Sequence, residues 1–229
     1  MIMPASFCDF PRASFRACVF GAVLLTSAAA APAMAQEPER VWNFRVYLND
    51  AAIGTHRFTL RSAGAERELL SEARFEVKVL GLTVYRYAHR AVENWRGDCL
   101  TKLTASTNDD GEKLAVDAAV EGDRLRVNAT GFKESLGGCV MSFAYWNPLM
   151  LRQSRLLNAQ TGQYEQVGIS LAGEEGVLVG GKPVTAKRYR ISGLKNPLDL
   201  YYSGSGEWLG LESTVGGGRR LRYQLAAPG

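Results

Sequence analysis

The chain has few of the side chains from which metal and redox centres are built. Its 229 residues include only two histidines, His56 and His89, and four cysteines. A site with three histidine ligands is therefore excluded. The sequence also lacks a Cys-x-x-Cys redox motif and a Gly-x-Ser-x-Gly nucleophile elbow. We expect no metal ion and no cofactor.

Neither positive nor negative charge is in large excess. The 27 Lys and Arg residues stand against 23 Asp and Glu, for a net charge of +4, and no basic run is present. Nucleic-acid-binding surfaces are usually clustered and more strongly basic, so we expect no nucleic-acid partner. The composition is 46% hydrophobic and 22% charged, which is enough apolar content for a packed core.

Residues 1–35 have the three-part organisation of a secretory signal peptide. Arg12 and Arg16 supply positive charge, residues 17–31 are apolar, and a small-x-small cleavage site ends at Ala35. The apolar run is shorter than the roughly 20 strongly apolar residues that a membrane span needs. We therefore expect cleavage after Ala35, a periplasmic or secreted protein, and no transmembrane segment in the mature part.

Two cysteines remain after this cleavage, Cys99 and Cys139. In an oxidising compartment an isolated pair of cysteines usually forms a disulfide. Their wide spacing favours a structural cross-link over a redox pair.

Apolar and polar residues alternate with period two over much of the chain, as in antiparallel strands with one buried face. The clearest runs are 42–48, 55–61, 124–129 and 220–225, whose second face is rich in arginine. Hairpin-type turns separate such runs and predict about a dozen strands. These turns are Asn49-Asp50, Ala63-Gly64, Asp109-Asp110-Gly111, Gly122-Asp123, Gly204-Ser205-Gly206 and Gly216-Gly217-Gly218.

One short helix is expected among these strands. Asn147 can cap it, Pro148 suits its first position, and residues 149–157 carry an apolar stripe. The prediction is thus an all-β fold: a single, strongly curled antiparallel sheet that forms a barrel or half-barrel with one short helix. No linker divides residues 36–229, which we expect to form one β-barrel-like domain.

A glycine-rich stretch invites a different interpretation. Gly176 to Lys182 matches the Gly-x-x-x-x-Gly-Lys part of a phosphate-binding loop. Pro183 stands where that loop needs Ser or Thr, and no helical pattern follows. We interpret Gly180-Gly181 as a hairpin turn.

The segment from Tyr85 to Trp95 is the most informative for function. As a strand, it places His89 and Glu93 on one face together with its aromatic side chains. These two groups lie about 13 Å apart on a strand, too far to bind one ion. Either both are ordinary buried polar groups with hydrogen-bond partners, which we favour, or they line a ligand cavity. The candidate ligand-binding residues are Tyr85, Tyr87, His89, Glu93, Trp95, Phe143, Tyr145 and Trp146.

Several stretches together resemble a family of exported proteobacterial proteins known as a domain of unknown function, the 6134 family. The resemblance covers nearly all of residues 41–225 and implies a periplasmic all-β domain without an assigned activity. The general layout is also similar to periplasmic lipid-carrier half-barrels and lipocalin-like domains. The stretches that carry the family resemblance are Phe44-x-Val46, Ile53-Gly54-x-His56, Tyr85-x-Tyr87-x-His89, Glu93-x-Trp95, Phe143-x-Tyr145-Trp146-x-Pro148, Leu157-Asn158-x-Gln160-Thr161-Gly162, Leu200-Tyr201-Tyr202 and Trp208-Leu209.

Three hypotheses for function follow. The first is a non-enzymatic binding module for a lipid or another hydrophobic ligand. The second is a hydrolase or isomerase of a lipophilic substrate that uses His56, His89 and Glu93. The third is an envelope-assembly module that binds proteins through a sheet edge. The sequence leaves the ligand, the catalytic role and the oligomeric state open.

Overall fold

The alternating pattern produces one long antiparallel sheet in the computed structural model, which describes residues 39–226. Residues 39–226 contain fifteen strands, where the sequence predicted about a dozen. Thirteen of them form the main sheet: β1 (Arg40–Leu48), β2 (Ala51–Ala63), β3 (Glu66–Val79), β4 (Leu82–Arg96), β5 (Cys99–Asp109), β6 (Glu112–Glu121), β7 (Arg124–Ala129), β8 (Phe132–Gly137), β11 (Gly168–Val179), β12 (Lys182–Ser192), β13 (Leu198–Tyr202), β14 (Trp208–Val215) and β15 (Arg219–Leu225).

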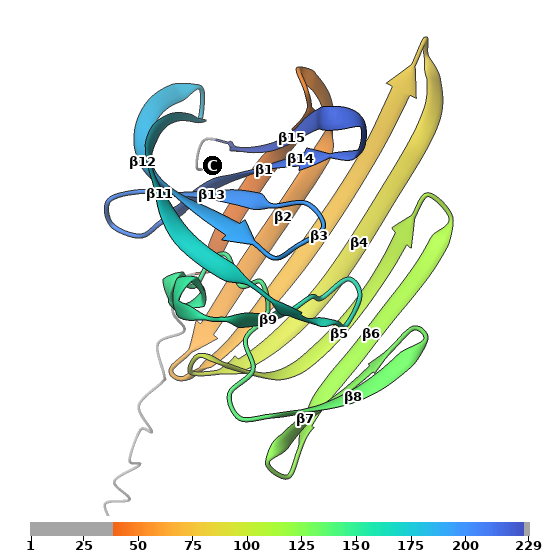
Figure 1. The fold of residues 1–229 in the computed structure, drawn as a ribbon, viewed down its shortest axis with the longest axis vertical. Helices are drawn as coiled ribbons and strands as arrows, with labels where there is room; N and C mark the ends of the chain where they lie inside the picture. Colours follow the sequence, from red (N-terminus) through yellow and green to blue (C-terminus); the bar gives the residue numbers. More distant parts are fainter. Residues whose placement is uncertain (1–38, 227–229) are drawn as a thin grey trace, which may run out of the picture. The chain divides into compact units, whose positions relative to one another are not determined.

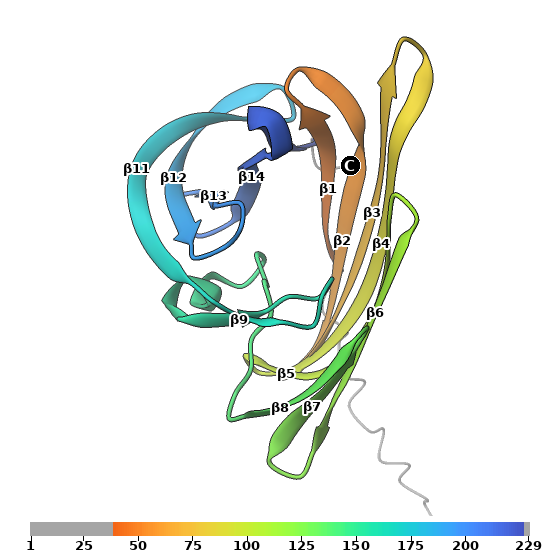
Figure 2. The same cartoon turned by 45° about the vertical axis from the view of Figure 1, so that its right-hand side comes forward.

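The strand order is β11-β12-β13-β14-β15-β1-β2-β3-β4-β5-β6-β7-β8. Strand β1 pairs with β2 and also with β15, so the first and last strands meet inside the sheet. The sheet curls strongly (Figures 1 and 2). Within residues 39–226 it does not close, because β8 and β11 remain as its two edges. The predicted signal peptide lies outside the described residues, and the single domain 36–229 stays a prediction.

A covering segment, residues 138–167, connects β8 to β11 and lies against the inner face of the sheet (Figure 2). It contains the 3-10 turn η1 (Pro148–Arg152) and a two-stranded sheet of β9 (Arg155–Leu157) and β10 (Tyr164–Gln166).

The predicted helix over residues 149–157 is therefore wrong in its length and type. Asn147 does accept a hydrogen bond from the Leu149 backbone N–H and Pro148 follows it, but the turn ends at Arg152. Leu156 and Leu157 are both fully buried, and Leu157 pairs with β10 and bridges to Ser142. Consecutive burial of two residues fits a short strand enclosed on both sides better than a one-sided helix.

The covering segment is tied to the sheet at its start. Cys99 and Cys139 form a disulfide with a Cα–Cα distance of 4.9 Å, which confirms the predicted cross-link. Next to it, the backbone N–H of Leu100 donates to the carbonyl of Val140 at 2.9 Å.

Aromatic side chains fill the space between the sheet and the covering segment. Phe44, Phe58 and Trp208 form one cluster, with ring centroids 4.4 to 6.1 Å apart. Tyr145 of the covering segment packs on Trp208 at 5.1 Å. These contacts thus join the middle strands β14, β1 and β2 of the main sheet to the segment that covers it.

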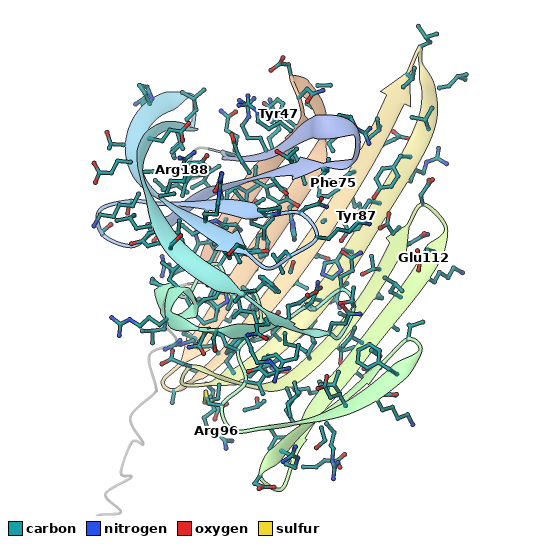
Figure 3. All side chains as sticks on the ribbon, viewed as in Figure 1. Tyr47, Phe75, Tyr87, Arg96, Glu112 and Arg188 are labelled. Atoms are coloured by element: carbon teal, nitrogen blue, oxygen red, sulfur yellow. A yellow bond between two sulfur atoms is a disulfide. The ribbon has the colours of Figure 1, made fainter. Side chains whose placement is uncertain are left out.

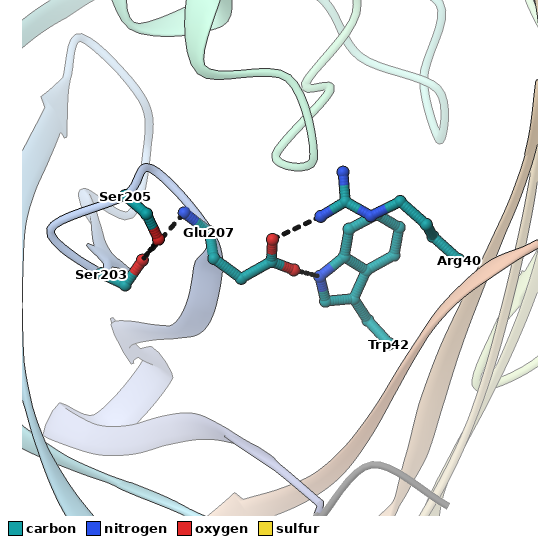
Figure 4. Close-up of polar contacts among 5 residues, drawn as sticks. All are labelled: Arg40, Trp42, Ser203, Ser205 and Glu207. Atoms are coloured by element: carbon teal, nitrogen blue, oxygen red, sulfur yellow. Dashed lines mark hydrogen bonds and ion pairs between the residues drawn. The ribbon is translucent and has the colours of Figure 1, made fainter.

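A polar bridge spans a gap in the sheet where β15 ends (Figure 4). Beyond Leu225, no strand of the described residues separates the start of β1 from the start of β14. Glu207 fills this position: its carboxylate accepts a hydrogen bond from Trp42 Nε1 at 2.8 Å and pairs with Arg40. The Ser203 hydroxyl accepts from the backbone N–H of Glu207 and holds the β13–β14 turn.

The predicted turns are found between consecutive strands. Gly180 and Gly181 connect β11 to β12 as a hairpin, so the interpretation against a phosphate loop is confirmed. In the described part of the chain, no helix has the length and apolar character needed to cross a bilayer.

Candidate ligand-binding cavity

A cavity of about 410 Å³ lies between the inner face of the sheet and the covering segment. The main sheet and its connecting loops line one side of the cavity with His56, Phe58, Leu69, Ser71, Tyr87, His89, Ala91, Glu93, Leu194, Lys195, Asn196, Leu198, Ser213, Val215, Leu221 and Tyr223. The covering segment contributes Phe143, Tyr145, Asn158, Ala159, Gln160 and Glu165. This size falls within the range of small-molecule sites.

Strand register brings the two histidines together. His56 on β2 pairs with Ala73 on β3, and Ala73 pairs with His89 on β4. Alternate positions of a strand share a face, so both imidazoles point into the cavity across one intervening strand. The side chain between them is only a methyl group, and their ring centroids lie 6.5 Å apart.

His56 is held on three sides. Its Nε2 lies 2.7 Å from the Ser71 hydroxyl, its Nδ1 lies 3.3 Å from the Tyr223 hydroxyl, and its ring stacks on Phe58 at 4.0 Å. Burial, helped by the nearby His89, lowers the pKa of His56 to about 3. The imidazole is therefore neutral at physiological pH.

His89 has one hydrogen-bond partner on the neighbouring strand. Its Nδ1 lies 2.8 Å from the Thr107 hydroxyl, and burial lowers its pKa to about 4. The side chains of His56 and His89 are both half-buried, because part of each is exposed to the open cavity. Both ring nitrogens of His56 already have hydrogen-bond partners, whereas His89 Nε2 has none among the described residues and can form a hydrogen bond with an uncharged ligand group.

Glu93 lies deeper, where the covering segment meets β4. Its side chain is buried, and its carboxylate accepts hydrogen bonds from the Ser142 hydroxyl at 3.0 and 3.1 Å and from Trp95 Nε1 at 3.1 Å. Burial raises the pKa of Glu93 to about 7, against the opposing effect of these two donors. The favoured interpretation of this residue, a buried polar group with ordinary partners, fits these contacts.

The raised pKa of Glu93 predicts a stability that falls as the pH rises. The unfolded chain releases this proton near pH 4.5 and the native chain near pH 7, so the native state holds the extra proton between these values. Across this window Glu93 is expected to contribute a decrease of about 3 kcal/mol to the free energy of unfolding. Urea unfolding at a series of pH values tests this contribution as the difference between the wild type and Glu93→Gln, in which it is absent.

Ser142→Ala provides the second variant for this experiment. It removes a donor that lowers the pKa of Glu93, so the decrease in stability is expected to extend to higher pH. A Glu93→Gln variant with the same pH slope as the wild type would contradict the assignment.

Tyrosines form part of the cavity lining. The Tyr87 hydroxyl donates to Gln160 Oε1 of the covering segment at 3.0 Å, and its ring stacks on Phe75 at 5.1 Å. Figure 3 shows these two aromatic residues on adjacent strands. Burial raises the pKa of Tyr87 well above its usual value, so it remains a neutral hydrogen-bonding group.

The structure brings five of the eight candidate residues to the cavity: Tyr87, His89, Glu93, Phe143 and Tyr145. The other three lie outside its lining. The Tyr85 hydroxyl donates to Asp109 at 2.6 Å, and Trp95 packs edge-to-face on Trp146 in the core, with centroids 5.6 Å apart.

Sequence reasoning missed Ser71 and Tyr223 as cavity residues. Both stand at inward positions of alternating strands, Ser71 between Leu69 and Ala73, and Tyr223 between Leu221 and Leu225. That alternation places them on the buried face, but the strand order is needed to bring them next to His56.

The two imidazoles of the cavity are weak bases, and the described residues place no carboxylate against them. A pKa of about 3 or 4 makes each imidazole a weak base at neutral pH. In the described residues, no carboxylate forms a hydrogen bond with either ring. No three His, Cys, Asp or Glu side chains of residues 39–226 cluster as metal ligands.

Comparison with known proteins gives a family and a fold. The family model described as "Domain of unknown function (DUF6134)" matches residues 44–226. A solved structure described as a beta-barrel-like protein of the domain of unknown function DUF1849, from Brucella abortus, is similar with a TM-score of 0.59 and 11% sequence identity. The match covers 82% of this chain and 95% of that chain. At this identity the likeness concerns the fold alone. No curated protein matches the chain.

Proposed function

Since the chain belongs to the family described as Domain of unknown function (DUF6134), we propose from its cavity that it binds a small, uncharged amphiphile between the sheet and the covering segment. The observation that carries this proposal is the pair of neutral imidazoles, His56 and His89, in one open cavity. Binding without catalysis remains the first hypothesis, now with a narrower ligand class.

Charge selects against an ionic ligand. A charged ligand group would find no counter-ion in His56 or His89, because pKa values of about 3 and 4 keep both imidazoles neutral at neutral pH. The remaining charged groups of the lining are Lys195, Glu165 and Glu93. Glu93 already uses its oxygens on Ser142 and Trp95.

The lining has both apolar and hydrogen-bonding surfaces, as an amphiphile requires. Phe58, Leu69 and Phe143 offer apolar contact, whereas the His89 imidazole and the tyrosine hydroxyls offer hydrogen bonds. A ligand with a hydrophobic body and one or two polar groups would satisfy both. The volume of about 410 Å³ suits such a molecule better than a whole phospholipid.

A pair of fluorescent probes tests the ligand class. N-phenylnaphthylamine is a neutral amphiphile with one N–H group, and anilinonaphthalene sulfonate is its sulfonated analogue. We expect the neutral probe to bind about tenfold or more tightly than the sulfonate in a titration at neutral pH. Equal or tighter binding of the sulfonate would contradict an uncharged ligand.

A substitution in the covering segment shows where the probe binds. Ala159→Phe adds a ring to the cavity wall without changing the sheet, and we expect it to weaken binding of the neutral probe about tenfold or more. Ala119→Phe, on the exposed face of β6, is the matched control and is expected to bind as the wild type does. Equal binding by all three proteins would place the probe elsewhere.

One contact favours a second candidate function, a hydrolase. The Ser71 hydroxyl lies 2.7 Å from His56 Nε2, the separation expected of a nucleophile and its base. The low basicity of His56 argues against this role. Hydrolysis of an activated ester that is lost in Ser71→Ala would favour the hydrolase over the binding module.

We also propose that the protein is exported. The Cys99–Cys139 disulfide is compatible with an oxidising compartment such as the periplasm. The envelope-assembly hypothesis rests on the two edge strands of the main sheet, β8 and β11. It ranks third because the binding hypothesis is supported by a defined cavity.

A further inference from the structure

The β3–β4 hairpin extends beyond the rest of the sheet. Strand β2 pairs with β3 only as far as Phe75, and β5 pairs with β4 only as far as Tyr87. Beyond these points, residues 77–85, here called the finger, form ladder pairs only with each other among the described strands. Figures 1 and 2 show the finger projecting past the neighbouring strands.

The tip of the finger is apolar and exposed. The exposed fractions are 99% for Leu80, 72% for Leu82, 54% for Val84 and 53% for Val79. Four of the nine exposed large hydrophobic residues in the described part of the chain are thus on this one hairpin. A contiguous exposed apolar surface of this kind marks an interaction site.

Leu80 occupies a position of the tip turn at which another residue would be more favourable. Leu80 and Gly81 both have positive φ, 52° and 81°, as a two-residue hairpin turn of the right twist requires. Asn is the favoured residue at the first of these positions, and a branched apolar side chain is unfavourable there. The backbone therefore gives no reason for Leu80, whereas a docking role of its side chain does.

Positive charge flanks this apolar tip on the outer face of the hairpin. Residues 72–90 carry four cations and two carboxylates, at alternating positions opposite the cavity face. Arg86 and Lys78 have exposed side chains, and Glu76 pairs with both of them. The net positive charge is complementary to a surface of anionic lipid headgroups.

The inner face of the finger leads to the cavity. Val77 pairs with Tyr85, and the next inward pair is Phe75 with Tyr87. Tyr87 itself lines the cavity. An apolar and aromatic track thus connects the exposed tip with the proposed ligand site.

We propose that the finger docks on a lipid bilayer that contains anionic lipids, with Leu80 and Leu82 inserted among the acyl chains. The role of the track in passing a ligand between bilayer and cavity rests on the proposed function; docking itself does not.

Vesicle flotation tests the docking, with the protein used as it is purified from cells after any cleavage of its N-terminal segment. Vesicles of phosphatidylcholine with phosphatidylglycerol are expected to bind the wild type, and vesicles of phosphatidylcholine alone to bind it less. Leu80→Asn suits the turn and removes the apolar side chain, so we expect about tenfold weaker vesicle binding without loss of folding. Leu171→Thr, which removes an exposed leucine of β11, is the control and is expected to bind normally.

Leu80→Trp gives an independent readout in the same vesicles. The four native tryptophans, Trp42, Trp95, Trp146 and Trp208, are all buried in the core, so lipids with brominated acyl chains are expected to quench only the new one. Absence of this additional quenching would overturn the proposal.

Other outcomes contradict the proposal as well. Flotation that is unchanged in Leu80→Asn would assign membrane binding to another part of the chain. Concentration-dependent self-association that is lost in Leu80→Asn, without vesicle binding, would identify a second copy as the partner of the tip. Probe binding by the cavity is measured without vesicles, so failure of docking and failure of the proposed function are distinguished.

Discussion

Acidification to about pH 4 is expected to lower the free energy of unfolding by about 5 kcal/mol through the two cavity histidines. Unfolded histidine takes up a proton near pH 6.5, whereas native His56 and His89 do so only near pH 3 and 4. The unfolded state therefore binds more protons between pH 6.5 and about 4, and stability falls as the pH falls. Water that reaches the cavity reduces the effect below the full sum of the two shifts.

The chain suits this measurement because it contains no other histidine. Glu93 has the opposite dependence on pH in an overlapping window, so the experiment uses the Glu93→Gln background. In this background, His56→Gln combined with His89→Asn is expected to remove the loss of stability at acid pH. Unfolding by urea at each pH provides the comparison. A loss of stability that persists in the triple variant would show that other groups cause it.

Removal of the disulfide is expected to destabilise the protein by about 4 kcal/mol. Cys99 and Cys139 are separated by 40 residues, and their cross-link restricts the unfolded chain over the whole of that loop. The cross-link also fixes the start of the covering segment, close to Ser142 and Glu93. The Cys99→Ala/Cys139→Ala variant is therefore expected to bind the neutral probe more weakly as well.

Guanidinium unfolding of this double variant gives the change in stability. The reduced wild type is its matched control, because both proteins lack the bond and keep the same remaining contacts. Equal unfolding midpoints for the oxidised wild type and the double variant would contradict a structural role of the disulfide.

Local patterns were sufficient to predict the strand that carries the site. Alternation from Tyr85 to Trp95 placed Tyr87, His89 and Glu93 on one inward face, and this is the arrangement in β4. The disulfide could also be predicted, because only two cysteines follow the expected cleavage site. Both inferences depend on neighbours in the sequence or on counting, and neither needs the strand order.

Features that depend on strand order could not be predicted. His56 and His89 meet because β3 lies between their strands with Ala73 in register with both. Tyr223 reaches His56 only because β15 pairs with β1. The helix predicted over residues 149–157 is wrong for a related reason: the burial of Leu156 and Leu157 arises from β10 and Ser142, which are their partners in the fold.

The central claim is that one cavity holds two neutral histidines and an uncharged ligand. Nuclear magnetic resonance of the protein with isotopically labelled histidine tests it most directly, because His56 and His89 give the only imidazole signals. We predict that both rings stay neutral down to about pH 5 and that N-phenylnaphthylamine shifts the signals of both. Titration of either ring near its ordinary value of 6.5, or signals that the probe leaves unchanged, would contradict the account.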